Sequence, residues 1–291
     1  MIETAGGLLT IVLRFVAVTA MTGTIGAWVF YRFVLPRLGE QVGAEVIAQW
    51  RTLAIRTVVA CAALVAAVAA ARFVLPSAGT QSAAAGFGPQ ALLAQCVIAG
   101  LTTLLWGATW GSPRFPQIAR DGIVVLLAFT PPLLAHAGTA TEMRAASFVV
   151  DIAHGLSAGA WIGALALVTL VVARARGTTH QVAHISALFG PFHRVAVIAA
   201  PVVFVTGLAT AWLRMGVPEG IANPTYSGLF VAKLLLAGVA GYFGAGHSKL
   251  ATKKGAAIDA RAVERTLAAE VGFAVMVFVL TALLLGTPPI G

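Results

Sequence analysis

Long runs of apolar residues fill most of the chain, and short polar or proline-containing segments separate them. A helix that crosses a membrane needs about 20 mostly apolar residues. Eight runs are long enough: 8–34, 52–75, 90–110, 121–137, 147–173, 192–214, 226–248 and 266–286. The segment 178–192 is less apolar, and we expect it to lie along the membrane surface before the sixth helix. The pattern therefore predicts an all-α fold, a polytopic membrane bundle of about eight transmembrane helices.

The composition supports this class. Only 10% of the residues are charged and 59% are hydrophobic, whereas soluble domains carry about 25% charged residues. No segment between the runs is long enough for a soluble domain, so we expect one integral membrane domain over 1–291. Its first three helices would occupy 1–120 and the other five 121–291. The net charge of +9 is spread between the runs, which does not indicate a nucleic-acid-binding patch.

The basic residues are divided unequally between the two sides of the predicted bundle. One side holds 14 of them: Arg32, Arg37, Arg51, Arg56, Arg114, Arg120, Arg174, Arg176, Arg194, Lys249, Lys253, Lys254, Arg261 and Arg265. The other side holds 5: Arg14, Arg72, Arg144, Arg214 and Lys233. Lys and Arg are enriched in cytoplasmic loops. The distribution therefore predicts that both termini face the outer side of the membrane.

The fifth run carries an acidic and an imidazole side chain inside the membrane. Asp151 and His154 are three residues apart, so they share one helix face. Ionisable groups at that depth are costly and usually functional. His136, at the end of the fourth run, should reach the same outer side. Imidazole suits copper and thioether sulfur suits its reduced form, so Met143 and Met215 near the outer side are possible soft ligands.

The same pair of residues also has a purely structural interpretation, in which Asp151 and His154 lock the packing of helices. Arg14, Asp151 and Lys233 are expected at similar depth, and a buried charge needs a partner. We therefore expect Asp151 to pair with Arg14 or Lys233. As a structural counter-ion it would stabilise the histidine site rather than bind the metal as a main ligand. A second stripe of the fifth helix should allow a close helix approach, and it consists of Gly155, Gly159 and Gly163.

Further ionisable residues are expected near the inner side. His193 opens the sixth run and His247 closes the seventh, so both should lie close to the inner face. A transported cation could leave there. Glu270 in the last run is expected to pair with Arg56 or Arg265 as a structural ion pair.

Taken in order, these residues resemble the copper resistance protein D (CopD) family. The similarity covers most of the chain and is densest from about His136 to Glu270. Its motifs are Leu13-Arg14-Phe15, His136-Ala137, Asp151-x-x-His154, Trp161-x-Gly163, Phe192 to Gly207, Thr225-Tyr226-Ser227-Gly228 followed by Lys233, and Arg265 to Glu270. The chain departs from the family pattern at His193 and His247, where a small polar residue and an asparagine are more common. The resemblance implies a bacterial inner-membrane protein of copper uptake or delivery, often with a periplasmic CopC-like copper-binding partner.

We therefore expect copper to enter from the periplasmic side at His136 and His154 and to leave toward His193 and His247. Asp151 would support this entry site as a neighbouring counter-ion. No catalytic motif of a metalloprotease, nucleotide hydrolase or serine hydrolase occurs, so we do not expect an enzyme. Two alternatives stay open. The outer and inner histidine pairs could each hold a haem b in a membrane cytochrome, or the chain could be a non-catalytic subunit of a larger membrane complex.

Overall fold

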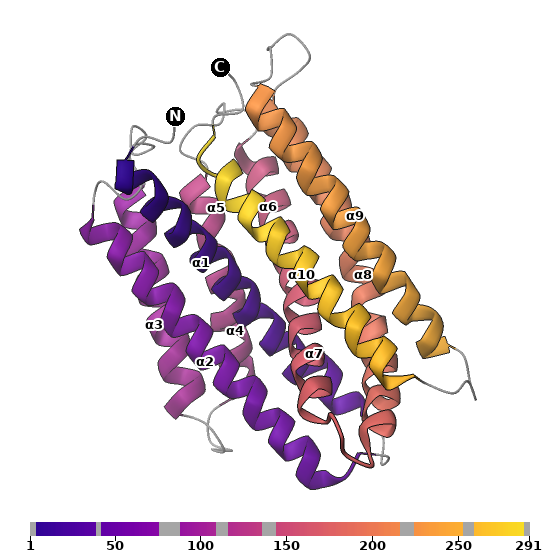
Figure 1. The fold of residues 1–291 in the computed structure, drawn as a ribbon. Helices are drawn as coiled ribbons and strands as arrows, with labels where there is room; N and C mark the ends of the chain where they lie inside the picture. The colour runs from indigo at the N-terminus through magenta and orange to yellow at the C-terminus, as the bar shows by residue number, and fades with distance from the viewer. Residues whose placement is uncertain are drawn as a thin grey trace.

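The computed structural model describes residues 4–38, 42–75, 88–108, 116–135, 144–215, 224–252 and 259–287. They form a bundle of long, roughly parallel and antiparallel helices (Figure 1). Within these residues, eight helical segments are long and apolar enough to cross a membrane: Gly7–Arg37, Ala44–Val74, Pro89–Ala108, Gln117–Leu134, Ala145–Arg174, Gln181–Leu213, Pro224–Gly246 and Ala260–Leu284. The predicted all-α membrane bundle is confirmed. Helix α1 begins and α10 ends at the same end of the bundle, called here the terminal end.

Three of the crossings contain a change of helix type or a break. The first consists of α1 (Thr4–Val29), the π-helix η1 (Phe30–Val34) and the 3-10 helix η2 (Leu35–Arg37). The fourth is divided into α4 (Gln117–Ala128) and α5 (Thr130–Ala135). The fifth consists of α6 (Arg144–Ala158), the π-helix η7 (Gly159–Gly163) and α7 (Ala164–Arg174). Such π-helical turns often accompany functional sites.

The other crossings are single α-helices: α2 (Ala44–Val74), α3 (Gly88–Ala108), α8 (Gln181–Met215), α9 (Pro224–Thr252) and α10 (Ala260–Leu284). The expected surface segment before the sixth helix is wrong, because residues 181–192 are the first turns of α8. Pro191 and Pro201 both lie inside α8. A proline in a membrane helix removes one backbone hydrogen bond without ending the helix where neighbouring groups compensate.

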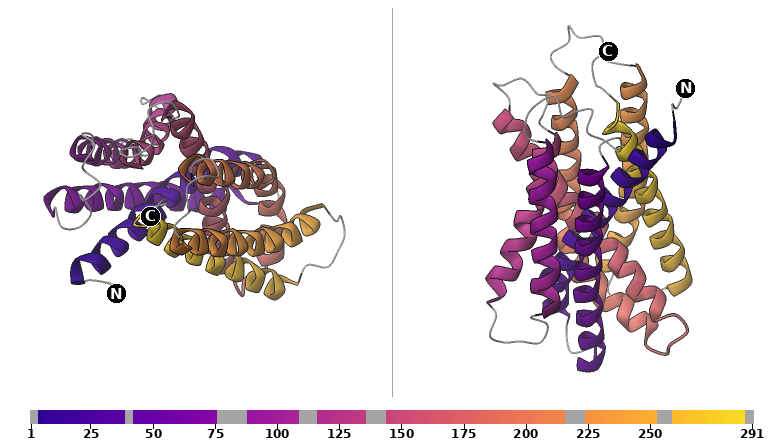
Figure 2. Two further views of the ribbon diagram at one scale, coloured as in Figure 1. Left: turned by 90° about the horizontal axis from the view of Figure 1, so that it is seen from above. Right: turned by 90° about the vertical axis from the view of Figure 1, so that its left-hand side faces the viewer.

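Helix α1 is the centre of the bundle. It contacts α2 on one side, α10 on another, and η7 and α7 between them (Figure 2). Its middle is made of small residues and is fully enclosed, as Ala20, Ile25 and Ala27 are at most 3% exposed. Membrane helices associate through packing rather than through hydrophobicity, so small residues mark the faces that come closest.

The closest approach joins α1 to η7. A Cβ atom placed on Gly163 would lie 2.2 Å from the carbonyl oxygen of Thr22, and one on Gly26 would lie 2.1 Å from the carbonyl carbon of Gly163. One on Gly159 would lie 2.5 Å from Ile25 Cβ. The predicted glycine stripe is therefore confirmed at two of its positions. At the third, Gly155, a Cβ would meet nothing within 4 Å.

Asp121 in α4 anchors the half of the first crossing that lies away from the terminal end. Its Oδ1 accepts hydrogen bonds from Trp28 Nε1 and Gln117 Nε2, each at 2.8 Å. Its Oδ2 accepts one from Arg32 Nε at 3.0 Å. Because the Arg32 side chain is 48% exposed, solvent screens that ion pair and the other two bonds contribute more.

We expect Asp121→Ala to lower the free energy of unfolding by about 2 kcal/mol, because three donors lose a charged acceptor. Thermal unfolding of the detergent-purified protein would measure the change. Glu45→Ala is the matched control, since Glu45 is exposed in the first turn of α2. Equal unfolding temperatures for the two variants would show that Asp121 does not hold these helices together.

Candidate functional site

A polar seam joins α6 to α8 in the half of the bundle near the terminal end. Helix α6 contributes Asp151 and His154, and α8 contributes Thr206 and Thr210. The two helices pack along each other. Residues three or four apart lie on one helix face, so each helix presents two polar side chains to the other in register.

The hydrogen bonds of His154 define the state of its imidazole. Its Nδ1 lies 3.2 Å from the carbonyl oxygen of Val203 and 3.1 Å from Thr206 Oγ1. A carbonyl oxygen only accepts hydrogen bonds, so Nδ1 is the donor. The Thr206 hydroxyl donates to the carbonyl of Val202, which leaves its oxygen to accept from Nδ1. In the neutral ring the lone pair is then on Nε2, the arrangement found in metal-binding histidines.

A glycine lies next to this imidazole, and an aromatic pair lies further along the same crossing. A Cβ atom on Gly207 would lie 3.3 Å from His154 Cε1, so the glycine of α8 makes room for the ring. Trp161, two turns further along the same crossing, is 3% exposed. Its ring centroid lies 6.0 Å from that of Phe204, and its Cη2 is 3.8 Å from the Cβ position of Gly241. Trp161 belongs to η7 and Phe204 to α8, two residues before Thr206, so this aromatic pair lies between the same two crossings as the seam.

Asp151 is oriented by α8 as well. Thr210 Oγ1 donates a hydrogen bond to Asp151 Oδ1 at 3.0 Å. The expected pairing of this carboxylate with Arg14 or Lys233 stays a prediction. The guanidinium of Arg14 lies against the backbone of α10's end, 2.2 Å from the Cβ position of Gly286.

Four of the predicted ligands cannot be placed. His136 and Met143 lie outside the described residues. Met215 belongs to α8 and His247 to α9, but their side chains lie outside the described part of the structure. Among the residues that are described, no three His, Cys, Asp or Glu side chains come together as a metal-binding group. Among the predicted ligands, His154 is the one whose ring orientation is defined by hydrogen bonds in the described part of the structure.

The predicted inner residues lie elsewhere in the bundle. His193 is a half-buried residue of α8, 13 positions before Thr206. At 1.5 Å per residue it is about 20 Å from the seam along the helix axis, so His154 and His193 cannot bind the same ion. Glu270 is 1% exposed, and its Oε1 lies 3.0 Å from the Cβ position of Gly244 in α9. Its pairing with Arg56 or Arg265 stays a prediction.

The α8 side of the seam was not predicted from the sequence. Thr206, Gly207 and Thr210 each contact one of the two predicted residues of α6. Two threonines four apart in an apolar run were the available signal, since hydroxyl groups inside a membrane helix often bond a neighbouring helix. The signal is weak because threonine also bonds its own helix, as Thr169 does with the carbonyl of Leu165.

Comparison with known proteins gives one match, in the C-terminal part of the chain. Residues 186–284 match the family model described as "Copper resistance protein D". No curated protein matches the chain, and no solved structure matches it. The matched residues run from the start of α8 to the end of α10, and they include the α8 side of the polar seam. Asp151 and His154 precede the match.

Proposed function

Because residues 186–284 match the family model of copper resistance protein D, we propose that this membrane protein carries copper and receives it at the seam between α6 and α8. The family is one of membrane proteins that handle copper. The observation that supports the seam most directly is the hydrogen bond of His154 Nδ1 to a backbone carbonyl, which assigns the ring's lone pair to Nε2. Imidazole nitrogen is a good copper ligand.

In this proposal copper is the cargo and His154 is the first ligand to hold it. Val203 and Thr206 fix the orientation of the ring, and Asp151 adds negative charge one turn away. His136 supplies the second imidazole. Met143 or Met215 supplies soft sulfur when copper is reduced. A periplasmic CopC-like protein would deliver the ion, in keeping with the family's association with such copper resistance systems.

The ion would then move toward His193 and His247. About 20 Å of α8 separate the seam from His193. The Trp161–Phe204 pair, of which Trp161 is buried, lies between them. Copper could not pass from His154 to His193 by direct exchange of ligands over that distance. Its transfer would therefore require the Trp161 and Phe204 rings to change rotamer. The end of the bundle opposite the terminal end carries most of the Lys and Arg residues and would face the cytoplasm. The proposed direction of copper movement is therefore inward.

Metal analysis and a visible spectrum of one purified sample would test the proposal. We expect bound copper and no Soret band. A reducible Soret band would indicate the haem alternative. A colourless sample that neither contains copper nor takes it up would indicate the accessory-subunit alternative, and either result would overturn the proposal.

The orientation of His154 gives a second test. Thr206→Val keeps the shape of the side chain but removes one of the two acceptors for Nδ1, and losing such a supporting bond typically weakens metal binding about tenfold or more. Thr206→Ser keeps the hydroxyl and should retain affinity. Copper titration of the purified variants would measure this.

The matched control is Thr169→Val in α7, whose hydroxyl bonds only the carbonyl of Leu165 one turn back. It should bind copper as the unmodified protein does. If Thr206→Val and Thr169→Val have the same affinity, Thr206 does not position the ligand.

A further inference from the structure

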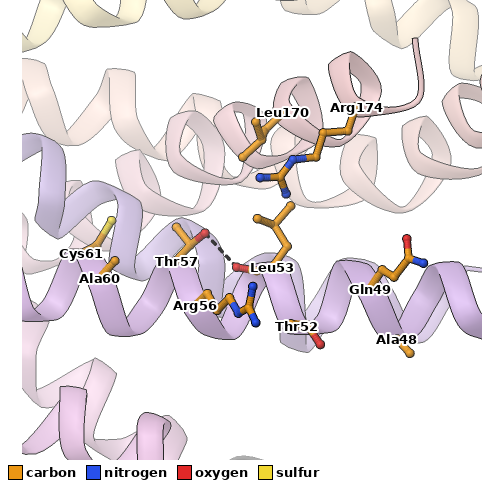
Figure 3. A pocket seen from close by; sticks show the side chains of 10 residues that line it. All are labelled: Ala48, Gln49, Thr52, Leu53, Arg56, Thr57, Ala60, Cys61, Leu170 and Arg174. Carbon is orange, nitrogen blue, oxygen red and sulfur yellow. Dashed lines mark hydrogen bonds between the residues drawn. The ribbon is translucent and has the colours of Figure 1, made fainter. Parts of the chain in front are cut away.

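A groove runs between α2 and α7 at the end of the bundle opposite the terminal end. Its volume is about 700 Å³. The close-up in Figure 3 shows the side chains that line it, which are Ala48, Gln49, Thr52, Leu53, Arg56, Thr57, Ala60, Cys61, Leu170 and Arg174. Arg174 is the last residue of α7, so the groove lies where α7 ends beside the longer α2.

The groove is positively charged. Two of its ten described lining residues are arginines, and no carboxylate is among them. Arg174 extends from α7 toward Leu53, and Arg56 lies on the other side of Leu53 on α2 (Figure 3). Both arginines are exposed. Guanidinium groups from two helices thus face one space, which is the arrangement suited to a phosphate, because the guanidinium donates two parallel hydrogen bonds to its oxygens.

Polarity changes along the groove. Gln49, Thr52 and Arg56 lie toward the start of α2, whereas Ala60 and Cys61 lie toward its middle. Leu170 of α7 lies opposite Leu53 of α2 (Figure 3). Both helices are parts of membrane crossings. The charged part is therefore nearer the membrane surface and the apolar part nearer the hydrocarbon, the same order as the headgroup and acyl chain of a lipid.

We propose that this groove binds a phospholipid with an anionic headgroup. Arg56 and Arg174 hold the phosphate, and one acyl chain lies along Leu170 and Ala60. The groove opens between helices that are parts of membrane crossings, where lipid is always present. Basic pockets between membrane helices are suited to anionic lipid headgroups, since each nearby Lys or Arg favours them.

The test uses the full-length protein, delipidated and placed in nanodiscs of phosphatidylcholine with or without phosphatidylglycerol. Lipid retained after re-extraction is measured by native mass spectrometry. We expect phosphatidylglycerol to be enriched on the order of tenfold over phosphatidylcholine, as two arginines would give. Enrichment should disappear in the double variant Arg56→Gln/Arg174→Gln.

Two controls make the result specific. Arg51→Gln/Arg265→Gln also removes two exposed positive charges, but neither residue lines the groove, so enrichment should persist. Ala60→Phe fills the apolar part and should reduce retention. Ala63→Phe, at an exposed position of α2 that does not line the groove, should not. Unfolding temperatures of all variants would establish that they are folded.

The outcomes separate lipid from free phosphate. Inorganic phosphate alone should neither bind to the delipidated protein nor displace the retained lipid at millimolar concentration. If it binds with the same dependence on Arg56 and Arg174 while Ala60→Phe has no effect, the site takes free phosphate and the lipid proposal is wrong. Equal retention of the two lipids, or unchanged enrichment in the double variant, would also overturn it.

Discussion

Replacing His154 with alanine is expected to reduce the copper bound by the purified protein at least about tenfold, since removing a ligand should cost no less than removing a residue that supports one. Copper uptake by cells that express the variant should fall in parallel. The reason is local: Nδ1 is engaged by Val203 and Thr206, so Nε2 is the nitrogen that faces a metal. No other described residue of the seam offers an imidazole.

His180→Ala is the matched control, because His180 is an exposed histidine just before α8 and distant from the seam. It should keep copper binding. His136→Ala tests the second ligand separately and should lower binding as His154→Ala does. If His154→Ala stays folded by thermal unfolding and binds copper normally, the seam is not the copper site, whatever the family of the C-terminal part.

Replacing Gly163 with alanine should destabilise the bundle by about 3 kcal/mol or prevent it from folding. The added methyl group would lie 2.2 Å from the carbonyl oxygen of Thr22. That oxygen belongs to the backbone of α1, so no side chain can rotate away and the whole helix must shift. Because α1 is the central helix, such a shift also disturbs its contacts with α2 and α10.

Gly155→Ala is the comparison, since its methyl group would meet nothing within 4 Å. It lies in the same crossing and should be neutral or slightly stabilising, because alanine favours the helix more than glycine does. Unfolding temperatures in one detergent would compare the two. Gly26→Ala should behave like Gly163→Ala. If Gly163→Ala unfolds at the same temperature as Gly155→Ala, the crossing of α1 and η7 is not as close as described.

The positions of the helices followed from the sequence to within a few residues for most crossings. Membrane helices need long apolar runs, and prolines between those runs marked the connections. The sixth helix differs most, as α8 begins at Gln181 rather than at 192, and α2 begins at Ala44 rather than at 52. Hydropathy locates the part of a helix that lies in hydrocarbon, but a helix continues into polar surroundings wherever its backbone bonds can still form. The π-helical turns η1 and η7 had no signal in the pattern either.

For the candidate site, the sequence identified one side and missed the other. Asp151 and His154 were recognised because ionisable residues are rare in a membrane helix. Their partners Thr206 and Thr210 were not, since threonine is common in such helices and usually bonds its own backbone. The groove between α2 and α7 could not be predicted, because Arg56 and Arg174 are far apart in the sequence.

The sequence by itself thus determined that this is a membrane protein of about eight helices, and that Asp151 and His154 lie on one helix face. Both conclusions rest on local physics, namely the length of apolar runs and the helical repeat. Only the tertiary structure decided that this face meets α8, that the lone pair of His154 is on Nε2, and that α1 crosses η7 at backbone contact. In a membrane, hydrophobicity does not distinguish the inner face of a helix from its lipid face. The rotation and neighbours of each helix therefore depend on how side chains from distant segments fit together.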